Sequence, residues 1–401
     1  MRSTAPRTPP WSGAPARRFV PALPTLEPRL LMPSWSPPRA PLFPFEPQRD
    51  GSAPSIQHFY LARAGVFHAI RHFLGGRPGT VLLPAYHHGV EVEAVRAAGA
   101  KLAFYRIDSE MRVDLDDLAE RARAPEVRVV YLTHFAGFAQ PVAEVARLCR
   151  ERGLFLVEDC ALALLSRDPF GRPLGQTGDA AVFCLYKTLP VPHGGLLVAR
   201  DVPLEDSPAP PLASTLHHAA GLLLADLELH SSGLGRTVRA LARAAAHATV
   251  DALVPMVQTG TQHLRARDLE LGASRLVEQL VGRIDLELVR VKRRRNFRRL
   301  ADALAGAPLV GAPLAEGACP LFVPLRVRDK PSALAALRAR GVEAIDFWRS
   351  GDPACDLKPF PEVAALRREV IELPCHQSLD DDAIDFVARA VKSAKEVLAH
   401  A

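Results

Sequence analysis

The chain has 401 residues, 48% of them hydrophobic and 23% charged, and its 50 basic and 44 acidic side chains give a formal net charge of +6. A chain of this length and composition can bury a large core, and we expect one large and one smaller domain. The modest positive charge permits an anionic substrate but does not demand a nucleic acid, which usually requires a concentrated basic stripe, so we expect no nucleic-acid partner. There is no apolar run of roughly 18 residues, so we expect no membrane span.

Residues 1–54 form a proline-rich arm that holds 14 of the 36 prolines. Because proline removes a backbone N–H donor and fixes φ, the arm is not expected to form a regular helix or a central strand. We expect it to begin disordered and then to lie extended across the body, where Phe43 and Phe45 can anchor it. A partner-binding proline motif is the alternative.

Residues 55–275 are expected to form a large α/β domain with a helical, Ala/Leu/Arg-rich insertion at 205–270. From residue 62 onward, short apolar strands alternate with amphipathic helices, which is typical of crossover units that build a mostly parallel sheet flanked by helices. Pro141 and Gly153 carry the start and stop signals of one such helix. The expected helices are 64–74, 90–98, 115–121 and 141–153, and the expected strands are 80–84, 101–107, 127–134, 154–159, 180–186 and 195–199.

Residues 276–401 are expected to form a linker helix followed by a small C-terminal α+β domain. The linker helix, 284–304, is almost entirely cationic from Arg290 to Arg299. A solvated face is the favoured interpretation, because a nucleic-acid patch needs stacking aromatics or a known binding motif. Strands and helices alternate again at 321–327, 332–340, 342–347 and 380–395. The six cysteines include no C-x-x-C pair, so we expect no disulfide framework, no metal site and a cytoplasmic location.

Polar side chains stand at the ends of the predicted strands, in Tyr86-His87-His88, at His134, in Glu158-Asp159 and in Tyr186-Lys187. Ligands of parallel α/β sheets bind beyond the carboxyl ends of the strands. A carboxylate and a lysine at that edge suit pyridoxal 5'-phosphate (PLP): a buried acid favours the protonated pyridine nitrogen, and an amine binds the aldehyde and later moves a proton. A surface ion pair is the alternative interpretation.

Six short motifs occur in a fixed order along the chain. They are Pro84-Ala85-Tyr86-His87-His88, the segment 99–108 (GAKLAFYRID), Val157-Glu158-Asp159-Cys160-Ala161, the segment 178–183 (GDAAVF), Lys187 seven residues before Gly194-Gly195, and Leu373-Pro374-Cys375-His376 with Leu379 and Asp385. This ordered series resembles the DegT/StrS-type family of PLP-dependent aminotransferases that act on nucleotide-linked sugars. It is much more specific than any one motif. The resemblance implies the aspartate-aminotransferase type of fold (fold type I).

The resemblance also assigns roles to individual residues. Asp159 would hold the pyridine nitrogen of PLP, and Lys187 would be the Schiff-base lysine. His88 falls where the family has an aromatic ring stacked on the cofactor, with core packing as the alternative. The turn Arg63-Ala64-Gly65 falls at the phosphate site, where a helix N-terminus suits an anion; Arg63 would grip the phosphate or be a surface charge. Cys184 stands where the family has a serine near the cofactor.

Some polar positions of the family are apolar here. Leu162 and Leu164 replace a Gln or Glu and a His, and the insertion at 205–270 replaces a segment that reaches the neighbouring subunit. The resemblance implies transfer of an amino group from a donor such as glutamate to a keto acceptor, a nucleotide-linked ketosugar for polysaccharide or natural-product biosynthesis, by a homodimer. The alternatives are a PLP-dependent sugar dehydratase, disfavoured because such relatives replace the lysine by histidine, and a non-catalytic scaffold or regulator.

Overall fold

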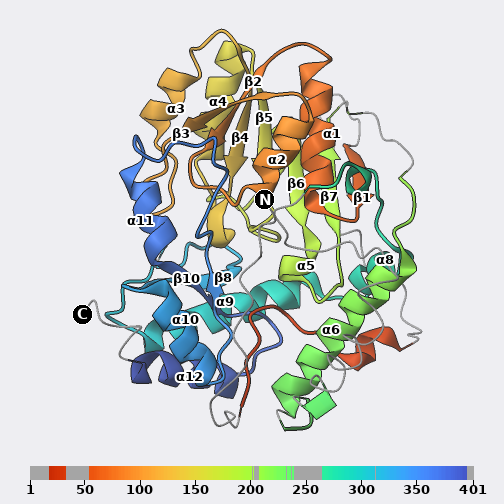
Figure 1. Cartoon of the computed structure of the whole chain (residues 1–401), viewed down its shortest axis with the longest axis vertical. Helices are drawn as coiled ribbons and strands as arrows, with labels where there is room; N and C mark the ends of the chain where they lie inside the picture. Colours follow the sequence, from red (N-terminus) through yellow and green to blue (C-terminus); the bar gives the residue numbers. More distant parts are fainter. Residues whose placement is uncertain are drawn as a thin grey trace, which may run out of the picture.

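The computed structural model describes residues 18–32, 54–200, 202, 207–231, 233–235, 237–238, 264–311 and 313–394. In this part of the chain a seven-stranded sheet forms the upper body and a three-stranded sheet lies below it (Figure 1). Phe43 and Phe45, the expected anchors of the arm, lie outside the described residues.

The large sheet has the strand order β1-β7-β6-β5-β4-β2-β3, and β7 alone runs antiparallel to its neighbours. The expected mostly parallel sheet is confirmed. The exception arises because residues 185–194 between β6 and β7 are too few for a crossover connection. The strands are β1 Ser55–Phe59, which the sequence pattern does not predict, β2 Thr80–Pro84, β3 Lys101–Tyr105, β4 Val127–Thr133, β5 Phe155–Asp159, β6 Ala180–Cys184 and β7 Gly195–Ala199.

Helices cover the faces of this sheet at the expected places. The Asp114 side chain accepts hydrogen bonds from the N–H groups of Asp116 and Asp117 at the start of α3. Gly153 ends α4 in the left-handed conformation that glycine favours. The helices are α1 Ala62–Leu74, α2 Val90–Ala97, α3 Leu115–Arg121, α4 Val142–Arg152, α5 Leu185–Thr188 and, within the expected helical insertion, α6 Leu212–His230; the 3-10 helices are η1 Pro28–Leu31, η2 Phe135–Gly137 and η3 Ala266–Leu269.

The small sheet has the order β8-β10-β9, with both pairings antiparallel. It packs with α9 and α12 around a hydrophobic cluster of its own that includes Leu300, Val323 and Val391. The last predicted strand before the C-terminal helix, 342–347, is reduced to two residues. The elements are β8 Phe322–Arg326, β9 Ile345–Asp346, β10 Val370–Pro374, α8 Arg275–Val281, α9 Leu286–Ala303, α10 Lys330–Ala339, α11 Pro361–Glu369 and α12 Asp381–Ser393.

The basic helix α9 has the solvated face that the sequence suggested, with Lys292, Arg295 and Arg298 exposed, but Arg293 and Arg294 are buried. Arg293 is fully buried, and its guanidinium donates to the carbonyl oxygens of Leu321 at 2.9 Å and Thr188 at 3.0 Å. Arg299 forms a bidentate pair with Asp385 of α12, with both N–O distances at 2.7 Å. The cations of α9 therefore tie the two sheets and α12 together, since carbonyls and carboxylates satisfy their donors.

Replacing Arg293 is expected to destabilise the fold strongly. In an Arg293→Met variant the side chain still fills space, but the buried carbonyls of Pro320 and Leu321 lose the donor that the guanidinium supplies. We expect the free energy of unfolding to fall by about 2–6 kcal/mol, since each buried acceptor left without a donor costs about 1–3 kcal/mol and two are affected. Urea unfolding measures this change. The control is Arg298→Met, an exposed position of the same helix; an equal effect of the two substitutions contradicts the assignment.

Residues 18–32 of the proline-rich arm lie across the small domain and α6. Val20 pairs with the chain beside Val342, through hydrogen bonds from Val20 N to Gly341 O (2.8 Å) and from Glu343 N to Val20 O (2.9 Å). The Thr25 hydroxyl donates to Asp226 of α6 at 2.8 Å. This part of the arm is therefore extended across the body, as expected.

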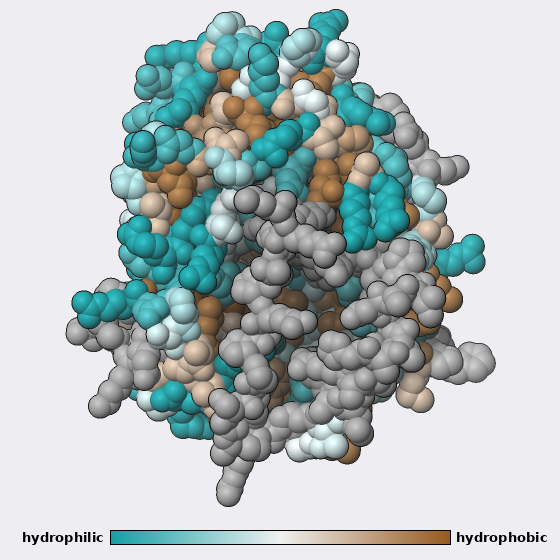
Figure 2. Space-filling view, viewed as in Figure 1, coloured by the Kyte–Doolittle hydropathy of each residue, from teal (hydrophilic) through white to brown (hydrophobic). Residues whose placement is uncertain are grey.

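Many hydrophilic side chains lie on the face of the molecule that Figure 2 shows. On the face shown in Figure 2 they line the upper rim and the left side, and hydrophobic residues appear between them as separate patches. Among the described residues, no helix combines the length and the apolar character that crossing a membrane requires.

Candidate active site

A cavity of about 370 Å³ lies between the carboxyl ends of the large-sheet strands and the small domain. Its lining includes the ends of β5 and β6, the first turn of α1, segment 345–348 and β10, together with Ala22 and Leu23 of the arm. Two larger cavities, of about 850 and 750 Å³, lie away from these strand ends and contain neither the expected lysine nor the expected aspartate. The chemistry, not the size, therefore marks the smaller cavity as the candidate site.

The structure brings most of the predicted site residues together in this cavity. Arg63, His88, Asp159, Cys184 and Lys187 all line it. Ala64 and Gly65 are buried but are not part of the lining. A Cβ atom on Gly65 would lie 3.2 Å from Leu197 Cβ, so this glycine lets α1 approach the sheet closely.

Asp159 ends β5 as a buried carboxylate. Its Oδ1 accepts a hydrogen bond from Ala161 N at 2.9 Å, and Thr133 Oγ1 lies 3.4 Å from Oδ2. Burial raises the pKa of this carboxyl, and the nearby Glu91 raises it further. A cationic ligand group would relieve this penalty on the ionised form, which is what a protonated pyridine nitrogen would supply.

His88 lies beside Glu91 at the start of α2. The Glu91 carboxylate accepts from the N–H of His88 at 2.8 Å and from that of Gly89 at 3.1 Å. Burial lowers the pKa of His88 to about 4, so its imidazole is neutral near pH 7. Its ring centroid lies 6.1 Å from that of Trp348, which also lines the cavity. A flat, neutral ring in this place can stack on a heteroaromatic ligand.

Lys187 lies in the short helix α5, which leaves β6 at the cavity. Its neighbour Thr188 is fixed from two sides, since Thr188 O accepts from Arg293 at 3.0 Å and from Gln377 Nε2 at 2.9 Å. These contacts hold the backbone of α5 against the small domain, so the lysine is presented to the cavity from a rigid turn.

Arg63 supplies a buried cation at the first turn of α1. Its side chain lines the cavity, and no carboxylate among the described residues pairs with it. A buried guanidinium without an acidic partner is suited to an anionic ligand, and the adjacent helix N-terminus favours the same charge. Together with Asp159 and Lys187, this arrangement fits the phosphate, ring nitrogen and aldehyde of PLP.

The wall beside Asp159 is less polar. Leu162 lines the cavity where the resemblance leads one to expect a polar residue, and Cys184 lies at the end of β6. Burial raises the pKa of the Cys184 thiol, so it remains protonated and is at most a weak hydrogen-bond donor.

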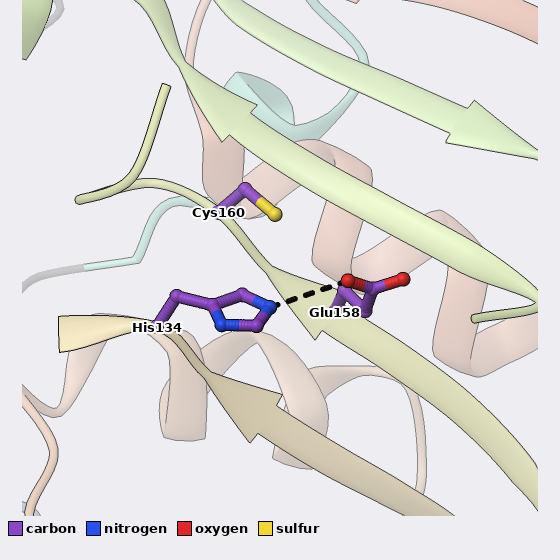
Figure 3. A group of neighbouring side chains, drawn as sticks. All are labelled: His134, Glu158 and Cys160. Atoms are coloured by element: carbon purple, nitrogen blue, oxygen red, sulfur yellow. Dashed lines mark hydrogen bonds and ion pairs between the residues drawn. The ribbon is translucent and has the colours of Figure 1, made fainter. Parts of the chain in front are cut away.

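His134, Glu158 and Cys160 form a buried cluster next to the cavity (Figure 3). His134 Nδ1 accepts from Gln140 N at 3.0 Å, so Nε2 carries the proton and donates to Glu158 at 3.2 Å. The Glu158 carboxylate also accepts from the N–H groups of Gly175, Thr177 and Gly178. Because the His134 and Glu158 side chains are already hydrogen-bonded to one another and to backbone N–H groups, the cluster fixes the end of β5 and these two groups are not available to a metal ion.

Sequence reasoning missed several residues of this site. Trp348 and Glu372 line the cavity from the small domain, and Arg293 and Gln377 hold α5. Gln377 directly follows the Leu373–His376 motif, so its place in the sequence could have indicated that it lies near the site. Nothing in the local pattern distinguishes Arg293 from the other cations of its helix.

Comparisons with known proteins agree with this geometry. A model of the DegT/DnrJ/EryC1/StrS aminotransferase family matches residues 64–392. A dTDP-4-dehydro-2,3,6-trideoxy-D-glucose 4-aminotransferase from Saccharopolyspora spinosa is 36% identical over 124 residues, which cover 30% of this chain and 32% of the relative. A serine hydroxymethyltransferase from Methanocella arvoryzae is 30% identical over 144 residues, 34% of each chain. The matched part is thus about a third of the length of these curated relatives.

Solved structures extend the likeness to most of the chain. A putative sugar aminotransferase from Streptococcus pneumoniae, solved in its PMP form, matches with a TM-score of 0.61 at 16% identity, covering 86% of this chain and 87% of the other. This likeness confirms the expected fold, a mostly parallel sheet flanked by helices with a small α+β unit.

Proposed function

Because the chain belongs to the DegT/DnrJ/EryC1/StrS aminotransferase family, whose members depend on PLP, we propose that it transfers an amino group from an amino acid such as glutamate to a keto group of a nucleotide-linked sugar. The observation that carries the proposal is the meeting in one cavity of Lys187, Asp159 and Arg63, which has no carboxylate partner in the described part of the chain. The relative that makes an amino sugar supports the substrate class.

In this proposal each residue has a separate task. The Arg63 guanidinium binds the phosphate of PLP as a bidentate donor. The Asp159 carboxylate would accept a hydrogen bond from the protonated ring nitrogen, and the neutral His88 ring would lie against the ring face. Lys187 would hold the cofactor covalently, and its free amine would move a proton to and from the reacting carbon. When bound, PLP supplies the electron-withdrawing ring that makes this proton removable.

The proposal is tested with the purified full-length chain. It is expected to bind PLP and to gain a visible absorbance band from the bound cofactor. Glutamate should abolish this band, and adding a nucleotide-linked ketosugar should restore it while an amino sugar appears by mass spectrometry. A sugar dehydratase would release no amino sugar, and a scaffold would leave the band unchanged by glutamate. Either result contradicts the proposal.

Arg63 is expected to determine the affinity for the cofactor. An Arg63→Ala variant loses the bidentate contact to a charged phosphate, worth about 1.5–3 kcal/mol, so the Kd for PLP should rise about 10- to 100-fold. Fluorescence titration of the PLP-free protein measures this change. The control is Arg71→Ala, an exposed position of the same helix. If Arg63→Ala leaves the Kd for PLP unchanged, Arg63 does not bind the phosphate and is a structural charge.

A homodimer and a cytoplasmic location complete the proposal. All six cysteines are described, buried and free, which suits a reducing compartment. Light scattering at micromolar concentration measures the oligomeric state, and a monomer contradicts the dimer.

A further inference from the structure

Glu372 is an acid in the cavity for which neither the motifs nor the proposed chemistry provides a role. It lies in the middle of β10, flanked by Ile371 and Leu373, both fully buried. Its own side chain is partly buried and lines the cavity together with Lys187 and Asp159. The strand alternation turns the apolar neighbours into the small-domain core and this carboxylate toward the ligand space.

The charged groups around Glu372 leave it without a direct partner. Lys330 at the start of α10 approaches it, but its ammonium already binds Asp346 Oδ1 at 2.7 Å and Phe347 O at 3.0 Å. Among the described residues, no hydrogen bond or ion pair joins the Glu372 carboxylate itself. A desolvated acid without a partner is costly, and such groups concentrate at functional sites.

The ionisation of Glu372 falls in the working range of the protein. Burial raises the pKa of this carboxyl to about 7; Lys187 and Lys330 oppose the rise, and Asp346 adds to it. Below that pH the group is neutral and can donate a hydrogen bond, and above it the group is an anion that only accepts. The small-domain wall therefore changes its charge near neutral pH.

The charge on this wall bears on the substrates. An amino-acid donor brings a carboxylate, whereas the sugar part of the acceptor brings hydroxyl groups. On the small-domain wall the described lining carries the acids Asp346 and Glu372 and no lysine or arginine. An ionised Glu372 repels the donor and accepts hydrogen bonds from the acceptor, while a protonated Glu372 can bind the donor carboxylate.

We propose that Glu372 is a specificity-determining residue of this cavity: its ionised form binds hydroxyl groups of the sugar acceptor, and it takes up one proton when the carboxylate of the amino-acid donor enters. This inference rests on the proposed function. It explains how one cavity can accept two substrates of different charge.

The first test is binding, without turnover. Glutarate, which is glutamate without its amino group, is titrated into the PLP-loaded chain by calorimetry at pH 6 and pH 8. Because Glu372 has a pKa of about 7, the Kd of the natural chain should be about tenfold higher at pH 8, and binding at pH 8 should take up close to one proton. In Glu372→Gln both effects should disappear, and Glu372→Asp should restore them in part.

The second test separates the two half-reactions. At pH 8, Glu372→Gln is expected to react about tenfold faster with subsaturating glutamate, because it lacks the anion that repels the glutamate carboxylate. It is expected to lose about tenfold in kcat/KM for the ketosugar, because the same anion accepts hydrogen bonds from the sugar hydroxyl groups. A merely structural role would slow both. Asp382→Asn, which removes an exposed acid outside the cavity, is the control for a general charge effect.

Several results overturn the inference. The inference fails if the natural chain does not bind glutarate at pH 6, or binds it equally well at pH 6 and pH 8. It also fails if the binding is equally pH-dependent in Glu372→Gln, or if this variant slows both half-reactions equally. These results differ from a failure of the proposed function, in which the natural chain itself neither loads PLP nor forms an amino sugar.

Discussion

A Lys187→Ala variant is expected to lose amino-group transfer by about 10⁴-fold. The lysine is the amine of the cavity, and its removal abolishes both the covalent attachment of PLP and the group that moves the proton. Mass spectrometry after borohydride reduction measures attachment directly. The natural chain should gain the mass of the reduced cofactor, and the variant should not.

Two further observations make the Lys187 result interpretable. Thr188 O is held by Arg293 and Gln377 through its backbone, so the alanine leaves α5 in place and the variant should unfold at the same urea concentration. Lys292→Ala, an exposed position of α9, should behave as the natural chain. If Lys187→Ala still gains the mass of the cofactor, another amine holds PLP and the site is assigned wrongly.

An Asp159→Asn variant is expected to lose about 10³-fold in transfer while retaining PLP. The amide has nearly the same shape as the carboxyl but no charge, so it cannot stabilise the protonated ring nitrogen. Burial has already raised the pKa of this carboxyl, and a bound cation would lower it again, so cofactor and aspartate should stabilise one another. The single-turnover rate with glutamate measures the loss.

The Asp159 prediction has a clear control. Glu120→Gln removes an acid from the exposed face of α3 and should leave the rate unchanged. A rate for Asp159→Asn within a fewfold of the natural chain would mean that this carboxylate is a structural group at the end of β5.

The sequence predicts which strand ends form the site, because short apolar runs and helical patterns alternate along the chain. Each strand of the large sheet except β1 is a short, mainly apolar run. Asp159 is the last residue of β5, and Lys187 comes just after β6. Parallel strands place such ends at one edge, so residues distant in sequence could be predicted to meet. Strand β1 was missed because it directly follows a proline-rich segment and its sequence, with Ser55, Gln57 and His58, is not an apolar run.

The residues that hold the site together could not be predicted in this way. Arg293 lies within a run of cations that looks solvated, and only the carbonyls of Thr188, Pro320 and Leu321 explain its burial. Glu372 interrupts an apolar strand, but the pattern does not show whether its carboxylate faces solvent, a partner or a ligand. Both depend on contacts between segments that are more than 20 residues apart, as in the 28-residue separation of Arg293 and Leu321.

The extended arm has a consequence for any shortened form of this protein. Ala22 and Leu23 line the cavity, and the residues just before them are bonded to the small domain at Gly341, Glu343 and His376. Deleting the chain up to Leu23 would therefore open the reaction chamber to water. Deletion up to Arg17 would leave every one of these bonds intact, so the two truncations should differ sharply in how well they protect a bound cofactor from solvent.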